Sequence, residues 1–192
     1  VSEREWGRNI AHIKRFVANE NQYSATRVGK NNLYKLFIAR AINLLKNGGI
    51  FSLIVPMSVL GDEQASGIRH LLMANGEFTE IHAFPQKDSI AKRVFPDAKL
   101  STALFVYRKL DEKRRTGARF PSHVHPGRFI EESNSTTLWT DSQSISVYDP
   151  VNLTVVSCTQ RDWDLMASLA TQEIGRVGSY VEFFQGEVNQ TV

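Results

Sequence analysis

A short run of apolar residues, Ile50 to Val55, constrains the fold of this chain more than any other feature. Asn47-Gly48-Gly49 precedes it and Pro56 ends it, so the run is bounded by turn residues and suits a strand better than a helix. A strand without polar alternation is typical of a parallel sheet with helices on both faces. The run therefore predicts an α/β fold in which this strand is covered on both sides.

The segments around this strand alternate between helical and extended patterns. The stretch 32–46 before it has an apolar face wide enough to predict deep burial. That face consists of two adjoining stripes, one made by Leu33, Phe37, Ala41 and Leu44, the other by Tyr34, Ile38, Ile42 and Leu45. Asp62 can cap a helix that ends at Asn75-Gly76. We also expect a helix over 5–18 and strands over 78–84 and 100–107, which together indicate an α/β sheet whose last two strands are neighbours in sequence.

The regular pattern ends at Lys109. The charged stretch Asp111 to Gly117 has the composition of a hinge, and Ser, Thr and isolated aromatic residues follow it. Residues 120–149 predict short strands and turns, and residues 161–169 predict a short helix. We therefore expect a domain boundary near residue 112, dividing the chain into 1–110 and a smaller mixed or β-rich segment, 111–192.

Composition excludes several classes of protein. Hydrophobic residues make up 42% and charged residues 22%, as in globular proteins. No apolar run approaches the roughly 20 residues that span a bilayer, and no signal-peptide pattern opens the chain. The single cysteine, Cys158, excludes an internal disulfide framework and fits a reducing cytoplasm. His123 and His125 would share one face of a strand, but no third ligand lies nearby, so we expect no metal site.

Three blocks carry a family resemblance: Gly29-Lys-Asn-Asn-Leu-Tyr-Lys-Leu-Phe37, Gly48-Gly-Ile-Phe-Ser-Leu-Ile-Val-Pro56, and Val94-Phe-Pro96 followed by Leu100 to Tyr107. In this order and spacing they resemble the second half of the catalytic domain of a gamma-class adenine-N6 DNA methyltransferase. The glycine-rich cofactor loop and the Asn/Asp-Pro-Pro-Tyr/Phe motif precede these blocks in that family. Neither occurs in this chain, so the resemblance implies a piece of an enzyme that is inactive alone.

The resemblance implies a class I, Rossmann-like methyltransferase sheet in which the third strand lies antiparallel between the first two. It implies methyl transfer from S-adenosylmethionine to adenine N6 in a restriction-modification or phage-defence system, in a bacterial or archaeal cytoplasm. The partners would be double-stranded DNA and the N-terminal half of the same enzyme, with no membrane. Residues 1–110 would be the C-terminal half of the catalytic domain, and 111–192 a linker and the start of a target-recognition region. The blocks 176–180 and 184–189 resemble the entry into that region.

Two aromatic residues fall on positions that bind the two substrates in that family. Phe95 matches the aromatic residue that stacks on the flipped target adenine, and Phe37 matches the one that stacks on the cofactor adenine. Pro56 would end a strand beside the cofactor cleft. The alternatives are ordinary: Phe95 could anchor its loop in the core, and Phe37 could be a core residue of its helix.

Basic residues surround the predicted base-stacking phenylalanine. Lys87, Lys92, Arg93 and Lys99 all fall in the loop that carries Phe95, and we expect them to contact DNA phosphates. The alternative is a solvated loop, since the net charge of +3 is weak support for a nucleic-acid partner.

The rival function is a non-catalytic DNA-binding or specificity module with a methyltransferase-like fold. A methyltransferase acting on RNA or protein is a further alternative. An incomplete sheet would also expose apolar edges and faces, so we expect self-association of the fragment.

Overall fold

The computed structural model describes residues 3–30, 32–130 and 132–172. Asn31 of the first family-like block lies outside the described residues. The blocks 176–180 and 184–189, which resemble the entry into a target-recognition region, also lie outside them.

The order of helices and strands follows the sequence patterns closely. The first part of the chain forms α1 (Glu3–Asn19), η1 (Asn21–Arg27), α2 (Leu33–Leu44), β1 (Ile50–Pro56), α3 (Ser58–Gly61), η2 (Glu63–Ala65), α4 (Ser66–Asn75), β2 (Gly76–Phe84), η3 (Ile90–Lys92) and β3 (Thr102–Lys109). The second part forms η4 (Glu112–Arg114), β4 (Phe120–Val124), η5 (Glu132–Asn134), β5 (Thr136–Thr140), α5 (Ser142–Tyr148) and α6 (Gln160–Ala170). The predicted helices and strands up to Lys109, and the helix near 161–169, are confirmed.

The strands form one mixed sheet in the order β1-β3-β2-β4-β5. Strand β3 pairs antiparallel with β1 on one side and with β2 on the other. The predicted insertion of the third strand between the first two is therefore confirmed, and the chain has a mixed α/β fold. Strand β4 continues the sheet parallel to β2, and β5 pairs antiparallel with β4.

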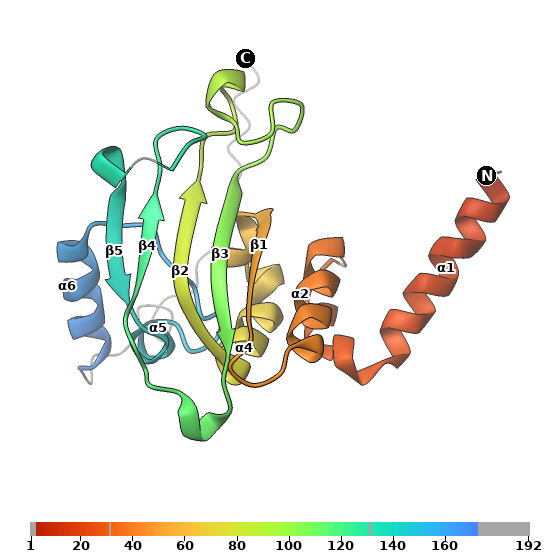
Figure 1. Ribbon diagram of the computed structural model, residues 1–192, viewed down its shortest axis with the longest axis horizontal. Coiled ribbons are helices and arrows are strands. Elements are labelled where there is room, and N and C mark those ends of the chain that lie inside the picture. Colours follow the sequence, from red (N-terminus) through yellow and green to blue (C-terminus); the bar gives the residue numbers. More distant parts are fainter. Residues whose placement is uncertain (1–2, 31, 131, 173–192) are drawn as a thin grey trace, which may run out of the picture.

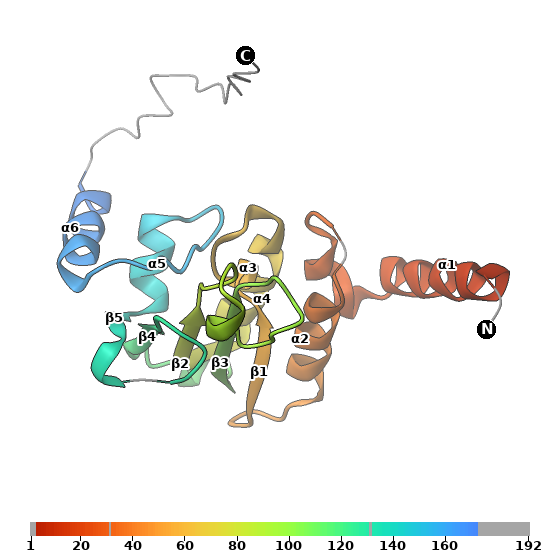
Figure 2. The same cartoon turned by 90° about the horizontal axis from the view of Figure 1, so that it is seen from above.

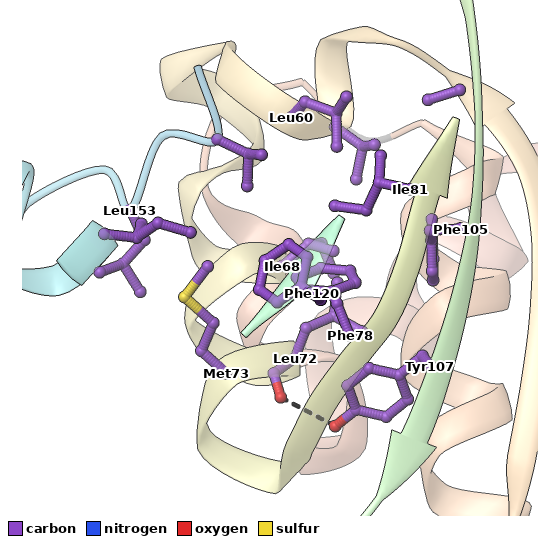
Figure 3. Close-up of a cluster of buried hydrophobic side chains, with 14 of the residues drawn as sticks. Leu60, Ile68, Leu72, Met73, Phe78, Ile81, Phe105, Tyr107, Phe120 and Leu153 are labelled. Carbon is purple, nitrogen blue, oxygen red and sulfur yellow. Dashed lines mark hydrogen bonds between the residues drawn. The ribbon is translucent and has the colours of Figure 1, made fainter. Parts of the chain in front are cut away.

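One face of the sheet carries the hydrophobic core. Helices α3, α4 and α5 lie over this face, as Figure 2 shows from above. Phe78 of β2 packs edge-on against Phe105 of β3, with ring centroids 5.6 Å apart. The hydroxyl of Tyr107 donates a hydrogen bond of 2.8 Å to the carbonyl of Leu72, which ties β3 to α4 (Figure 3). Burial raises the pKa of this phenol, so it remains a donor.

The opposite face of the sheet is not covered by any of the described helices, and Figure 1 looks onto it. The side chains of Ile50 and Ile54 on β1 point to this face and remain 52% and 53% exposed. The prediction that β1 is covered on both faces is therefore wrong for the described residues. Its outward-facing isoleucines stay half-exposed, although Ser52 is the one polar residue in the run that contains them.

Helix α2 is buried along only one of its two apolar stripes. Ile38 and Ile42 are 0% and 2% exposed, whereas Leu33, Phe37 and Leu44 are 70%, 64% and 69% exposed. The prediction of deep burial for the whole apolar face is thus wrong. A helix that meets a sheet edge-on can bury about one stripe, and the other stripe points away from the sheet.

The charged stretch after Lys109 is fastened to the first part of the chain. The carboxylate of Glu77 on β2 accepts hydrogen bonds from the backbone N–H groups of Thr116 and Gly117, at 2.6 and 2.9 Å. Arg115 donates to the carbonyl of Met73 in α4. The two segments therefore share one sheet, and the functional division near residue 112 stays a prediction.

Residues 120–149 form short strands, as predicted, namely β4 and β5, but also helix α5, which the sequence patterns did not predict. Asp141 caps this helix, because its carboxylate accepts a hydrogen bond of 2.7 Å from the N–H of Ser144. The Asp-Ser-Gln-Ser order at 141–144 was a usable N-cap signal.

Helix α1 extends away from the rest of the molecule in both views (Figures 1 and 2). Val17, close to its C-terminal end, is buried, whereas Ile13 and Phe16 remain 52% and 47% exposed. Among the described helices, none is long and apolar enough to cross a membrane.

Candidate functional site

The candidate site lies at the carboxyl edge of the sheet. Strands β1 and β2 are both antiparallel to β3, so their carboxyl ends meet at the same edge. The turn Met57-Ser58 follows β1, and residues 85–101, called loop 85–101 below, connect β2 to β3. An open pocket of about 430 Å³ lies between them, with Met57, Ser58, Asp62, Lys87, Lys99 and Ser101 among its lining residues.

Loop 85–101 is closed by hydrogen bonds at its two ends. The hydroxyl of Ser101 donates to the carbonyl of Pro85 at 2.8 Å. The carbonyl of Ser101 accepts from the N–H of Met57 at 2.9 Å, which extends the pairing of β1 with β3 into the loop. The pocket wall made by this loop is thus fixed to the end of β1.

Arg93 organises the middle of the loop. Its guanidinium donates to the carbonyls of Lys87 and Pro96, on either side of the turn η3. Asp88 and Lys99 form an ion pair of 3.0 Å across the loop. The hydrogen bond from Lys99 lowers the pKa of the Asp88 carboxyl.

Phe95 lies within this organised loop with its side chain 48% exposed. It is therefore not a core anchor of the kind that the alternative required. Its half-exposed ring is held in a loop whose backbone is fixed by Arg93, which is an arrangement that can present an aromatic face to a ligand.

The four basic residues of the loop differ in their surroundings. Lys87 and Lys99 line the pocket, and Lys99 is already paired with Asp88. Lys92 is exposed and is not among the pocket-lining residues. Arg93 donates to loop carbonyls, so its main role in the structure is to shape the loop.

Phe37 lies on helix α2, and Pro56 ends β1, the strand that follows α2 in the chain. The ring of Phe37 is 64% exposed on α2, so it is not a core residue of the described chain. Pro56 is half-buried at the last position of β1, opposite Thr102 of β3. A ring this exposed is available to stack on a planar group.

Lys35 explains part of the first family-like block, and the sequence reasoning missed it. Its side chain is 1% exposed, and its ammonium donates to the carbonyls of Val28 and Lys30, both at 2.8 Å, and to that of Gln64. Burial lowers the pKa of this amine. Gly29 lies between two of these carbonyls with φ of +66°, and an added Cβ would come 2.9 Å from the Cα of Gln64. Gly29 and Lys35 together fix the loop before α2.

Arg69 of α4 is a second buried cation that the sequence did not reveal. It is 1% exposed and donates to the carbonyls of Val59, Asp62 and Asn152. These bonds tie the turns after β1 to the segment after α5. A cation on an otherwise amphipathic helix gave no signal that it points inward.

The imidazoles of His82, His123 and His125 gather on the uncovered face of the sheet. They are stacked and hydrogen-bonded, with the His82 and His123 ring planes inclined by only 20°. Among residues 3–30, 32–130 and 132–172, no group of three or more His, Cys, Asp or Glu side chains is arranged to hold a metal ion.

Comparison with known proteins finds a similarity in the first half of the chain. The Eco57I restriction-modification methylase family matches residues 8–90, which run from α1 to the start of loop 85–101. Residues 8–90 are therefore similar to restriction-modification methylases. The match includes the first two of the three family-like blocks and ends before the third, which carries Phe95.

A curated methylase covers a similar share of the chain. A Type II methyltransferase of Thermus thermophilus is 32% identical over 102 residues, which are 50% of this chain. The match spans 22% of the length of that relative.

Solved structures of restriction-modification proteins are similar over larger parts of the chain at low identity. The type I restriction-modification methyltransferase subunit from Streptococcus thermophilus aligns with a TM-score of 0.48 and 15% identity, over 71% of this chain and 33% of that one. The type IIG restriction endonuclease BpuSI aligns with a TM-score of 0.41 and 21% identity, over 65% and 13% of the two chains.

Proposed function

We propose that this chain is part of an S-adenosylmethionine-dependent adenine-N6 DNA methyltransferase of a restriction-modification or phage-defence system. One observation carries the proposal. A stretch that matches the methylase family model leads directly into a fixed loop at the carboxyl edge of its sheet, and that loop presents the half-exposed ring of Phe95. Ligands of open α/β sheets bind at this edge.

Phe95 would close one face of the target base. Adenine inside a duplex cannot be reached, so the base must be flipped out and held flat before its amino group can react. A stacked aromatic ring is worth about 1–3 kcal/mol per base and does not depend on hydrogen bonding. The hydrogen bonds of Arg93 within the loop support this role, because a ring on a fixed backbone loses less conformational freedom on binding.

Phe37 and Pro56 would serve the cofactor. S-adenosylmethionine supplies a methyl group activated by a sulfonium, and its adenine needs an apolar face to stack on. The exposed ring of Phe37 fits that need, and Pro56 would border the same cleft. The residues described here would hold the adenine end of the cofactor, while the glycine-rich loop of the family would hold the remainder.

Lys87, Lys92 and Lys99 would contact the DNA backbone. Lys87 and Lys99 line the pocket beside the end of β1, within reach of phosphates that flank a nucleotide entering there. Arg93 would act indirectly, by holding the loop in shape. Sequence selection would come from the region after residue 111, since phosphate contacts do not distinguish bases.

We expect this chain alone not to methylate DNA. The motif that polarises the amino group and the loop that grips the cofactor are absent from its 192 residues, and transfer requires both reactants to be positioned together. The remainder of the enzyme would be its partner, and the complete protein would act on DNA in a bacterial or archaeal cytoplasm.

The test uses the complete reading frame and this chain in parallel. Each is incubated with tritiated S-adenosylmethionine and mixed-sequence duplex, and the DNA is digested to nucleosides. Label in N6-methyldeoxyadenosine from the complete enzyme only is the expected result. Label on cytosine, or none from the complete enzyme, would refute adenine methylation, and label from this chain alone would refute its dependence on the missing motifs.

A Phe95→Ala variant of the complete enzyme tests the role of the loop. With a fluorescent base analogue at the target position, we expect flipping to fall about tenfold or more while cofactor affinity stays unchanged. Wild-type flipping and turnover would reduce Phe95 to an ordinary loop residue.

A further inference from the structure

Helix α1 is a positively charged segment over most of its length. From residue 7 to its end at residue 19 it contains no acidic residue. The same stretch contains four residues with basic side chains, namely Arg8, His12, Lys14 and Arg15, and all four are exposed. The charge of this part of the helix is therefore not balanced within the helix itself.

Arg8 and Arg15 project from the same side of α1. An α-helix turns by about 100° per residue, so these two residues differ by only about 20° around the axis. Val17, which is 5% exposed, lies about 160–180° from both. Because Val17 faces the body of the protein, the two guanidinium groups face away from it. They are separated by about 10 Å along the axis, and His12 lies between them.

The base of the helix is held by its neighbours, so the fold sets the direction of this basic side. The ring of Phe16 contacts that of Tyr23 in η1, with centroids 6.0 Å apart, and the N–H of Glu20 donates to the carbonyl of Phe16 at 3.1 Å. In turn η1 packs on α4 so closely that a Cβ added at Gly67 would clash with the carbonyl of Ala25. The remainder of α1 extends from this base as an arm (Figures 1 and 2).

The two guanidinium groups of the arm have no acidic partner among the described side chains. The ion pairs within the described part of the chain lie elsewhere, on β2 and β4, in loop 85–101 and at η4. The next two arginines differ from them, because Arg27 donates to the carbonyl of Glu20 and Arg40 to the side chain of Gln22. Arg8 and Arg15 are therefore available to an external anion.

We propose that α1 is an arm that binds the sugar-phosphate backbone of duplex DNA through Arg8 and Arg15, outside the pocket beside loop 85–101. Each guanidinium can bind one phosphate, because it stays charged and offers paired N–H donors. Their separation is comparable with the widths of the DNA grooves, about 6–12 Å, so both can reach phosphates of one duplex. Such contacts add affinity without reading sequence, so the choice of site stays with other residues.

The arm points to the side of the molecule where DNA would reach the pocket. In Figure 1 its N-terminal end is directed toward the edge at which β2 ends and loop 85–101 starts. The arm and the loop would thus contact one duplex at separate points. This inference rests on the DNA partner of the proposed function, but not on its methyl transfer, cofactor or target base.

A membrane surface is another partner that a basic amphipathic helix can have, but it fits α1 less well. On a membrane, the apolar side of the helix must enter the lipid along its length. In α1 that side is already partly occupied by the protein, since Val17 is buried and Ile10 is half-buried. The basic side is open along the arm, which favours the phosphate backbone of DNA.

The experiment measures binding of this chain to a fluorescent mixed-sequence duplex by anisotropy at several salt concentrations. Each phosphate contact contributes about 0.9 to the slope of log binding constant against log salt concentration. Arg8→Gln and Arg15→Gln should each reduce this slope by about one unit, and the double variant by about two. Arg161→Gln on α6, at the opposite end of the molecule, is the matched control and should leave the slope unchanged. Glutamine is nearly as good a helix former as arginine, so melting curves should not change.

Lys87→Gln, measured alongside, separates the arm from the loop. A slope that falls in Lys87→Gln but not in the double variant of the arm would overturn the arm and leave the DNA site of the proposed function intact. An equal fall in Arg161→Gln, or no duplex binding by the wild-type chain at low salt, would also overturn it. Binding to phosphatidylglycerol vesicles that is lost in Ile13→Gln, without duplex binding, would assign the helix to a membrane instead. Methylation by the complete enzyme is measured separately, so its failure would leave the result for the arm unchanged.

Discussion

We expect Lys35→Met to destabilise the folded chain strongly, although it hardly changes the size of the side chain. The ammonium of Lys35 is the single donor that gathers the carbonyls of Val28, Lys30 and Gln64, and its side chain is 1% exposed. Methionine has nearly the same length and no donor. It would therefore fill the space and leave three carbonyls without their partner.

The magnitude follows from the number of bonds lost and the charge removed. Hydrogen bonds to a charged group contribute roughly 1.5–3 kcal/mol each, so three of them correspond to about 5–9 kcal/mol. Removing a buried ammonium recovers several kcal/mol of desolvation, in line with the lowered pKa of Lys35. We expect a net loss of about 3 kcal/mol in the free energy of unfolding, which is roughly 6–12 °C in Tm for a chain of this size.

Urea unfolding and thermal melting measure the loss, and limited trypsin digestion locates it. Cleavage after Arg27 and Lys30 should accelerate in the variant, because the loop that Lys35 holds is released. Lys46→Met is the matched control, since that side chain is exposed beyond the end of α2. A loss below about 1 kcal/mol with unchanged cleavage would show that the three carbonyls find other donors, and would refute the reasoning.

Three further predictions test the candidate site and its support. Phe37→Ala should weaken S-adenosylmethionine binding by the complete enzyme by about tenfold. Because the ring is 64% exposed, the free energy of unfolding should change by less than about 1 kcal/mol. An unchanged affinity in calorimetric titration would contradict the prediction. Gly29→Ala should cost more than Gly48→Ala in urea unfolding. Both glycines have positive φ, at +66° and +82°, but only the first would bring a Cβ within 2.9 Å of the Cα of Gln64, so equal losses would exclude the steric argument. Lys87→Gln should reduce the slope of log binding constant against log salt concentration by about one unit, without changing the DNA sequence that is chosen. An unaltered slope in filter binding would count against a phosphate contact.

The sequence predicted the elements up to Lys109 because each carries a strong local signal. The glycines at 48 and 49, the cap at Asp62 and the apolar runs of β1 and β3 all favour the same structure at their own positions. Helix α5 was missed because its signal is one capping residue followed by a short polar turn. The placement of β3 between β1 and β2 came from the family resemblance, since no local pattern states which strands pair.

The sequence by itself determined the order of the helices and strands up to Lys109, and it directed attention to Phe37, Phe95 and the basic loop. Only the tertiary structure decided which of their faces are open. Burial depends on what packs across from a residue, so Ile54 and Phe37 look like core residues in sequence yet lie exposed. Lys35 and His82 look like surface residues yet lie buried, because hydrogen-bonding partners from distant parts of the chain surround them. Pairings of this kind arise from distant segments meeting in space, and they carry no periodicity that a single stretch of sequence could show.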